Sequence, residues 1–79
     1  MIVVIVKTTD RARIAEALRA ALGLTLRGDH VRAFCATLPE EARRAADTLR
    51  SFGHEVIEHA PDAAIDAAIR EARGVEVWT

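Results

Sequence analysis

The stretch Ile2-Val3-Val4-Ile5-Val6 decides the fold of this chain. All five residues are β-branched and none is polar, a composition typical of a strand that is covered on both faces. Such strands lie inside parallel sheets, because helices pack on either side of these sheets. We therefore expect Ile2 to Val6 to form the central strand of a parallel sheet.

Helix and strand signals alternate along the rest of the chain. Three further strands are expected at the segments Val31 to Ala36, Glu55 to His59 and Val75 to Trp78. Three helices are expected between the strands. The first starts at Thr9 or Asp10 and stops near Gly28, the second starts at Pro39 and stops at Gly53, and the third starts at Pro61 and stops at Gly74. The order βαβαβαβ with short connections specifies a parallel sheet with right-handed crossovers.

Charged residues predict the order of the strands. The third strand carries Glu55, Glu58 and His59, which would be costly to desolvate in a covered position, so we place it at an edge beside the second strand. The last strand carries Glu76 and takes the other edge, beside the first. The sequence thus predicts one domain, residues 1–79, with an α/β fold of three layers (α/β/α). Its four-stranded parallel sheet has the order 3-2-1-4, with two helices on one face and the third helix alone on the other.

The third helix offers little apolar surface for covering a sheet face. Its inner stripe consists of Ile65, Ala68, Ile69 and Ala72. Asp66 and Arg70 can pair on its outer side, because they are four residues apart. Because the stripe is small, we expect a homo-oligomer in which the thinly covered face or an open sheet edge meets its copy in another subunit.

Composition excludes several classes of function. The chain has 11 Lys and Arg against 12 Asp and Glu, a net charge of −1, which gives no bulk attraction to nucleic acid or to an anionic membrane. Aromatic residues make up 4%, too few for a platform that stacks single-stranded nucleic acid. No segment approaches the roughly 20 apolar residues of a membrane helix, and the opening run lacks the features of a signal peptide. We expect a cytoplasmic protein, and its single cysteine fits that compartment.

The carboxyl ends of the strands are the expected place for a ligand, because open parallel sheets bind ligands where the winding direction reverses. The candidate ligand-binding residues at this rim are Lys7, Thr8, Thr9, His59 and Trp78. The first three precede a helix N-terminus and could hold a small anion, although ordinary helix capping explains them as well. His59 could exchange a proton or be an exposed loop residue, and Trp78 could line the rim or contact another subunit.

Cys35 is the only candidate catalytic nucleophile. The N-terminus of the second helix follows closely and would favour the thiolate that a persulfide carrier needs. Cys35 also alternates with apolar neighbours, as a core residue does. The histidines predict no metal site, because His54 and His59 fall on opposite faces of a strand and His30 lies at the far rim. No phosphate or dinucleotide motif predicts a cofactor.

Four segments together resemble a known family: the apolar first strand, Ala17 to Gly28, His30 to Phe34 and Leu49 to Val56. They are similar to the DsrE/DsrF-like family of small sulfur-relay proteins. The resemblance implies a cytosolic α/β domain that forms oligomers, with a sulfur-relay protein as a possible partner. In the family the persulfide cysteine follows the third strand, where this chain has His59-Ala60-Pro61 and no thiol.

We therefore expect an accessory or structural subunit of sulfur metabolism. Two alternatives remain. In the first, the chain is a sulfur carrier or transferase that uses Cys35. In the second, it is a module that binds a small anion at the carboxyl rim of the sheet.

Overall fold

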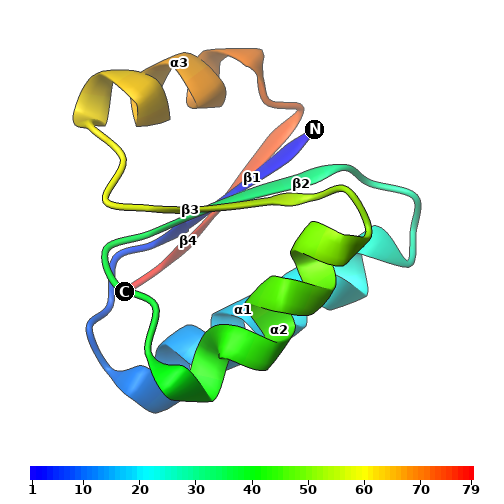
Figure 1. Ribbon diagram of the computed structural model, residues 1–79. Helices are drawn as coiled ribbons and strands as arrows, with labels where there is room; N and C mark the ends of the chain where they lie inside the picture. The colour runs from blue at the N-terminus through cyan, green and yellow to red at the C-terminus, as the bar shows by residue number, and fades with distance from the viewer.

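Seven elements alternate along the chain in the computed structural model, which describes residues 1–79 (Figure 1). They are β1 (Ile2–Val6), α1 (Arg11–Thr25), β2 (Val31–Cys35), α2 (Glu40–Ser51), β3 (Glu55–Glu58), α3 (Asp62–Glu71) and β4 (Gly74–Trp78). All neighbouring strands are parallel, and their order in the sheet is β3-β2-β1-β4. The predicted fold class and strand order are confirmed.

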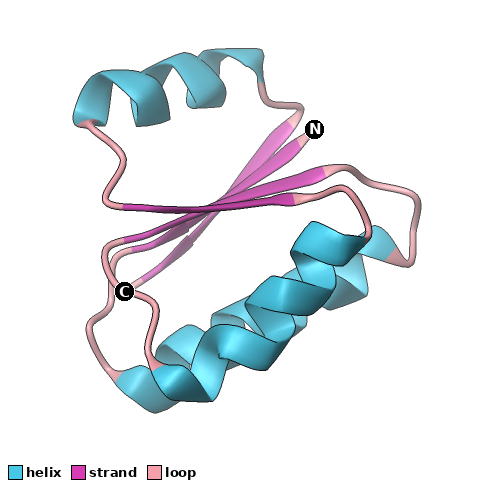
Figure 2. Cartoon of the chain, in the orientation of Figure 1, coloured by secondary structure: helices cyan, strands magenta, loops and turns pink.

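The sheet separates two unequal helix layers. Helices α1 and α2 lie side by side on one face, whereas α3 lies alone on the other (Figure 2). All three helices run antiparallel to the strands that they connect, so their N-termini lie near the carboxyl ends of the strands. None of the helices combines the length and the apolar character needed to cross a membrane.

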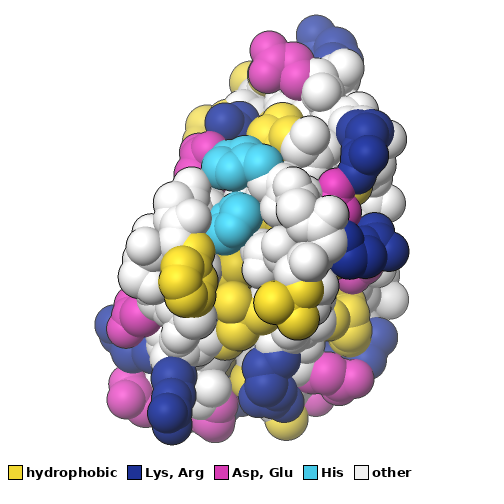
Figure 3. Space-filling view, turned by 90° about the vertical axis from the view of Figure 1, so that its right-hand side faces the viewer, with side chains coloured by type: hydrophobic (Ala, Val, Ile, Leu, Met, Phe, Trp, Pro, Cys, Tyr) yellow, Lys and Arg dark blue, Asp and Glu magenta, His cyan; other side chains and the backbone are white.

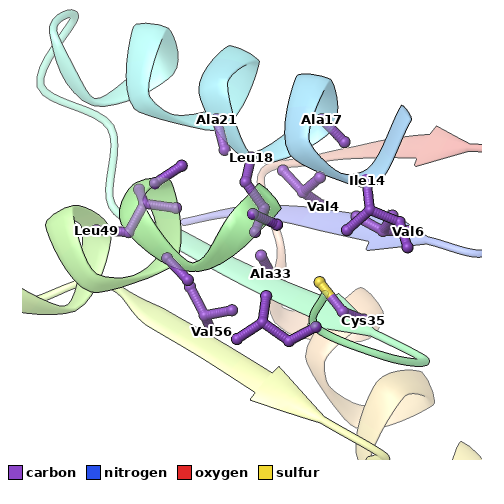
Figure 4. Close-up of a cluster of buried hydrophobic side chains, with 14 of the residues drawn as sticks. Val4, Val6, Ile14, Ala17, Leu18, Ala21, Ala33, Cys35, Leu49 and Val56 are labelled. Carbon is purple, nitrogen blue, oxygen red and sulfur yellow. The ribbon is translucent and has the colours of Figure 1, made fainter. Parts of the chain in front are cut away.

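The larger core lies between the sheet and the α1/α2 layer. It is a cluster of 16 buried residues, and Figure 4 shows Val4 and Val6 of β1 facing Ile14 and Leu18 of α1. Alternate residues of β1 point to opposite faces, so Val3 and Ile5 contribute to the other side of the sheet. β1 is therefore covered on both faces, as the run of β-branched residues predicts.

The smaller core lies under α3 and contains four buried residues, Val3, Ile5, Phe34 and Ala68. Ala68 is the only buried residue of α3. The helix leaves part of β4 uncovered, and Val75 and Val77 on this face are 44% and 51% exposed. At β4 the third helix therefore covers its sheet face only thinly, as the sequence predicts.

Three element ends differ from the sequence prediction. β2 and β3 each end one residue earlier, at Cys35 and Glu58, and His59 leaves the sheet with a positive φ of 54°. α3 ends at Glu71 rather than at Gly74, which already belongs to β4. Gly74 is paired with Ile2 of β1, and a Cβ at Gly74 would lie 3.1 Å from Cδ1 of Ile2. The glycine thus permits close packing in the strand rather than stopping the helix.

Candidate functional site

An open groove of about 520 Å³ lies at the carboxyl ends of the strands, between the sheet and α3. The ends of β1 and β2, the segment after β3 and one face of α3 form its walls. The groove brings together three of the residues that the sequence predicts for a site, Lys7, Cys35 and His59. It lies at the rim where the sheet topology places ligands.

The groove has an apolar floor and a partly acidic wall. Ile5 and Phe34 belong to the buried cluster under α3. The wall comes from one stripe of α3, the residues Asp62, Ile65, Asp66 and Ile69. These positions follow the spacing i, i+3, i+4 and i+7, so they share one face of the helix.

The ion pair that the spacing allows between Asp66 and Arg70 does not form. No ion pair or side-chain hydrogen bond of the structure involves Asp66, and its side chain lines the groove instead. The i,i+4 spacing shows that two side chains can meet, but it does not show which face of the helix they occupy. The same spacing also joins Asp66 to Asp62 and could have indicated the acidic wall.

His59 marks the point where the chain turns from β3 toward α3. Its backbone N–H donates to the carbonyl oxygen of Cys35 at 3.1 Å, which continues the strand pairing by one hydrogen bond. Its φ of 54° lies in the left-handed region, which histidine adopts more readily than most residues. The side chain is exposed and lines the groove.

Cys35 reaches the groove from β2, but its side chain belongs to the core on the other side of the sheet. Figure 4 shows it among the residues packed beneath α1 and α2, and it is 3% exposed. Burial raises the pKa of the Cys35 thiol to about 11, and the nearby Glu58 carboxylate adds to the rise while Arg50 opposes it. The thiol is therefore neutral near pH 7, and the following helix N-terminus does not activate it.

The other predicted site residues, Thr8, Thr9 and Trp78, do not line the groove, and the backbone of Lys7 is bonded to the end of β4. The backbone N–H groups of Lys7 and Thr8 donate to the carbonyl oxygen of Trp78, at 2.8 and 3.3 Å, and Oγ1 of Thr8 accepts from the N–H of Asp10 at 3.1 Å. These donors and this hydroxyl are thus used within the chain, and Thr9 is exposed nearby. No side chain caps α1, because the side chain of its N-cap residue Asp10 makes no cap hydrogen bond, so helix capping does not account for these residues.

Trp78 packs on the α1/α2 side of the sheet. Its ring lies below the guanidinium of Arg13, at 5.0 Å from the ring centroid, and its Nε1 donates to Glu76 at 2.9 Å. Nε of Arg13 also donates to the carbonyl oxygen of Thr79 at 2.8 Å. These contacts attach the end of β4 to α1 and account for the tryptophan without a ligand.

The sequence reasoning missed a pair of histidines at the amino ends of the strands. The rings of His30 and His54 lie 5.2 Å apart, and Figure 3 shows two histidines side by side on this face. Each residue directly precedes a strand, β2 or β3, and these strands are neighbours. Given the predicted strand order, the pairing could have been read from the sequence.

This histidine pair is held in a network of hydrogen bonds. Nδ1 of His54 accepts from the N–H of Val31 at 3.1 Å, and Nε2 of His30 lies 3.5 Å from a carboxylate oxygen of Glu55. Arg32 donates to the same carboxylate at 3.1 Å, and this bond lowers the pKa of Glu55. No group of three His, Cys, Asp or Glu side chains forms that could hold a metal ion. The network therefore connects β2 to β3.

Searches against protein-family models, curated proteins and solved structures found no match. The function of the chain must therefore be inferred from its own surfaces and side chains.

Proposed function

We propose that this chain is an accessory subunit of sulfur metabolism in the cytoplasm, similar to the DsrE/DsrF-like proteins. It acts by assembling with further copies of itself and with a sulfur-relay partner protein, and it does not carry sulfur on its own cysteine. Two features support the proposal that the chain does not carry sulfur on its own cysteine. The segment His59-Ala60-Pro61, where the resemblance implies a persulfide cysteine, has no thiol. Cys35 is buried, and its neutral thiol is a poor nucleophile.

The observation that carries the assembly is the surface of β4. This strand lies at an edge of the sheet, so its outer backbone N–H and C=O groups have no strand partner. The exposed Val75 and Val77 lie on its α3 side. An edge strand with exposed apolar side chains is a template for pairing with another chain, and a soluble protein normally protects such an edge with charges. β3, at the opposite edge, carries Glu55 and Glu58, whereas β4 has the single charge of Glu76, which accepts a hydrogen bond from Nε1 of Trp78 and lies on the face away from Val75 and Val77.

A second copy of the chain fits this edge in an antiparallel arrangement around a twofold axis. If the axis passes at Val77, this valine lies opposite Val77 of the second copy, and Glu76 lies opposite the second copy's Trp78. This register avoids the contact between two Glu76 carboxylates that an axis at Glu76 would create. The result is a continuous eight-stranded sheet in which Val77 of each copy protects Val77 of the other from water, and Val75 lies opposite the second copy's Thr79.

Analytical ultracentrifugation with Val77→Lys tests the assembly. We expect the unmodified chain to sediment as a dimer at micromolar concentration and Val77→Lys to sediment as a monomer, because two lysines would face each other across the axis. Ala67→Lys on the exposed side of α3 is the matched control and should remain a dimer. A stable monomer of the unmodified chain at micromolar concentration would contradict the proposal, as would a dimer of Val77→Lys.

Treatment with a persulfide donor, followed by intact-mass spectrometry, tests whether the chain carries sulfur. We expect no sulfur-sized adduct on the folded chain and an adduct after unfolding in urea, because only unfolding exposes Cys35. An adduct on the folded chain, absent from Cys35→Ala, would favour the carrier function instead.

A further inference from the structure

We propose that the groove between the sheet and α3 binds a small molecule that carries a primary ammonium group on an apolar body. The site lies within one chain, so it does not depend on the assembly proposed above.

The apolar part of the groove has the size and composition of a ligand site. The whole groove has a volume of about 520 Å³, which falls in the usual range of small-molecule sites, roughly 300–1,000 Å³. The sheet supplies Ile5 and Phe34, and α3 supplies Ile65 and Ile69 on the facing side. Ile69 is partly open to solvent although it faces this groove. An apolar ligand body would rest on the largely buried Ile5 and Phe34 and remove the exposed parts of Ile65 and Ile69 from water.

Charge selects the group that the ligand presents. Asp62 and Asp66 lie one helical turn apart on the groove wall, and neither takes part in any of the seven ion pairs of the chain. Five of the other ten acidic residues are paired with a basic side chain, as Glu41 is with Arg11 at 2.9 Å. Two unpaired carboxylates beside an apolar floor attract a cation more than an anion.

The groove is also lined by His59 and by Lys7, which takes part in no ion pair. Lys7 could hold a carboxylate if the ligand has one, as an apolar amino acid does. A simple amine and an amino acid share the ammonium group and the apolar body, so both belong to the proposed class. A purely anionic ligand would meet two carboxylates for one ammonium, so this charge balance disfavours it.

Titration of the ¹⁵N-labelled chain, followed by NMR, tests the site with three related probes. Phenethylamine carries the ammonium alone, phenylalanine carries both charges, and 3-phenylpropionate carries the carboxylate alone. We expect the first two to shift the amide signals of α3, His59 and Phe34 at millimolar concentration. 3-Phenylpropionate should leave these signals in place. A stronger effect of phenylalanine than of phenethylamine would identify the amino acid as the better ligand within the class.

Substitutions at Asp66 test the role of the charge. Asp66→Asn should weaken phenethylamine binding about threefold, the effect of one partly exposed charge pair. Asp66→Lys should reverse the preference and favour 3-phenylpropionate. The control is Asp47→Asn on the exposed side of α2, which should bind like the unmodified chain. The NMR spectra also report whether each variant is folded.

Three results would overturn the proposal. The first is equal binding of phenethylamine and 3-phenylpropionate, since charge would then play no part. The second is an amine effect that is spread over the whole surface or absent at millimolar concentration. The third is unchanged phenethylamine binding by a folded Asp66→Lys variant.

Discussion

Leu18 and Leu26 differ strongly in burial, so the same substitution, leucine to alanine, at each position tests the packing that the structure describes. Both belong to the α1 region, but Leu18 is fully buried in the larger core, whereas Leu26 at the end of the helix is 89% exposed. Leu18→Ala and Leu26→Ala remove the same atoms. Any difference between the variants therefore reports the surroundings of the two side chains.

The structure sets the expected size of each effect. Replacing a fully buried leucine by alanine costs about 3–4 kcal/mol, because apolar contact is lost and a cavity remains. A chain of 79 residues has a total unfolding free energy of roughly 4–12 kcal/mol. Leu18→Ala should thus remove a large part of the stability of the chain. Leu26→Ala should change it by about 0.5 kcal/mol or less, because the side chain already contacts water.

Urea unfolding followed by circular dichroism measures both values. The concentration of the chain must be the same in all samples, because assembly adds to the apparent stability. We expect a lower urea midpoint for Leu18→Ala with an unchanged dependence on urea concentration, since the same surface is exposed on unfolding. At about 4–8 °C per kcal/mol, its melting temperature should fall by roughly 12–32 °C, and that of Leu26→Ala by less than about 4 °C.

Equal losses at the two positions would refute the reasoning. A large effect of Leu26→Ala would mean that this side chain is covered, by another copy or by a different packing of the end of α1. A small effect of Leu18→Ala would mean that the core between the sheet and the α1/α2 layer is not packed as described.

Two further predictions concern titratable groups. Cys35 should react with maleimide at pH 7.5 only after unfolding, because the folded chain buries it and holds its pKa near 11; rapid labelling of the folded chain would contradict this. The hydrogen bond from Arg32 lowers the pKa of Glu55, so the ionised carboxylate stabilises the fold above roughly pH 4, and this contribution is lost as the pH falls through the lowered pKa. Glu55→Gln should therefore flatten the loss of stability between pH 6 and pH 3, measured as the urea midpoint. Glu16→Gln, an exposed residue without an ion pair, should leave that profile unchanged, and equal profiles for the two variants would contradict the role of Glu55.

The strand order could be predicted because charge and composition differ so much between the strands. The run Ile2–Val6 has no polar residue and can lie only where both faces are covered, whereas Glu55 and Glu58 fit only an edge. In the structure the Glu55 carboxylate is partly exposed and contacts Arg32 of the neighbouring strand. The cost of burying charge thus gave the topology without any knowledge of the packing.

The composition of the groove could not be predicted in the same way. The sequence gives Lys7 and His59 as rim residues, because each directly follows a strand. The contribution of Asp62 and Asp66 depends on the rotation of α3 about its own axis. The sequence places Ile65, Ala68, Ile69 and Ala72 on the inner face of this helix, and Ile65, Ala68 and Ala72 do pack against the sheet side. The sequence pattern does not show that the border of this face, with Asp62 and Asp66, lines an open groove. Ala68 is buried with Ile5 and Phe34, and Ile65 and Ala72 pack against the same cluster, so these side chains fix which face meets the sheet.

The unequal helix layers also determine how the proposed interactions would act on the fold. α3 has a single buried side chain, so its local opening costs less free energy than opening α1 or α2. A ligand in the groove contacts α3 and the sheet at once and therefore binds only the docked helix. At a concentration of 100 times its Kd, such a ligand stabilises the docked state by about 2.7 kcal/mol. Pairing of the β4 edges would also oppose opening, because α3 leads into β4 through Ala72 and Arg73. Both proposed interactions would thus stabilise the layer that has the least stability of its own, while α1 and α2 hold the sheet in place.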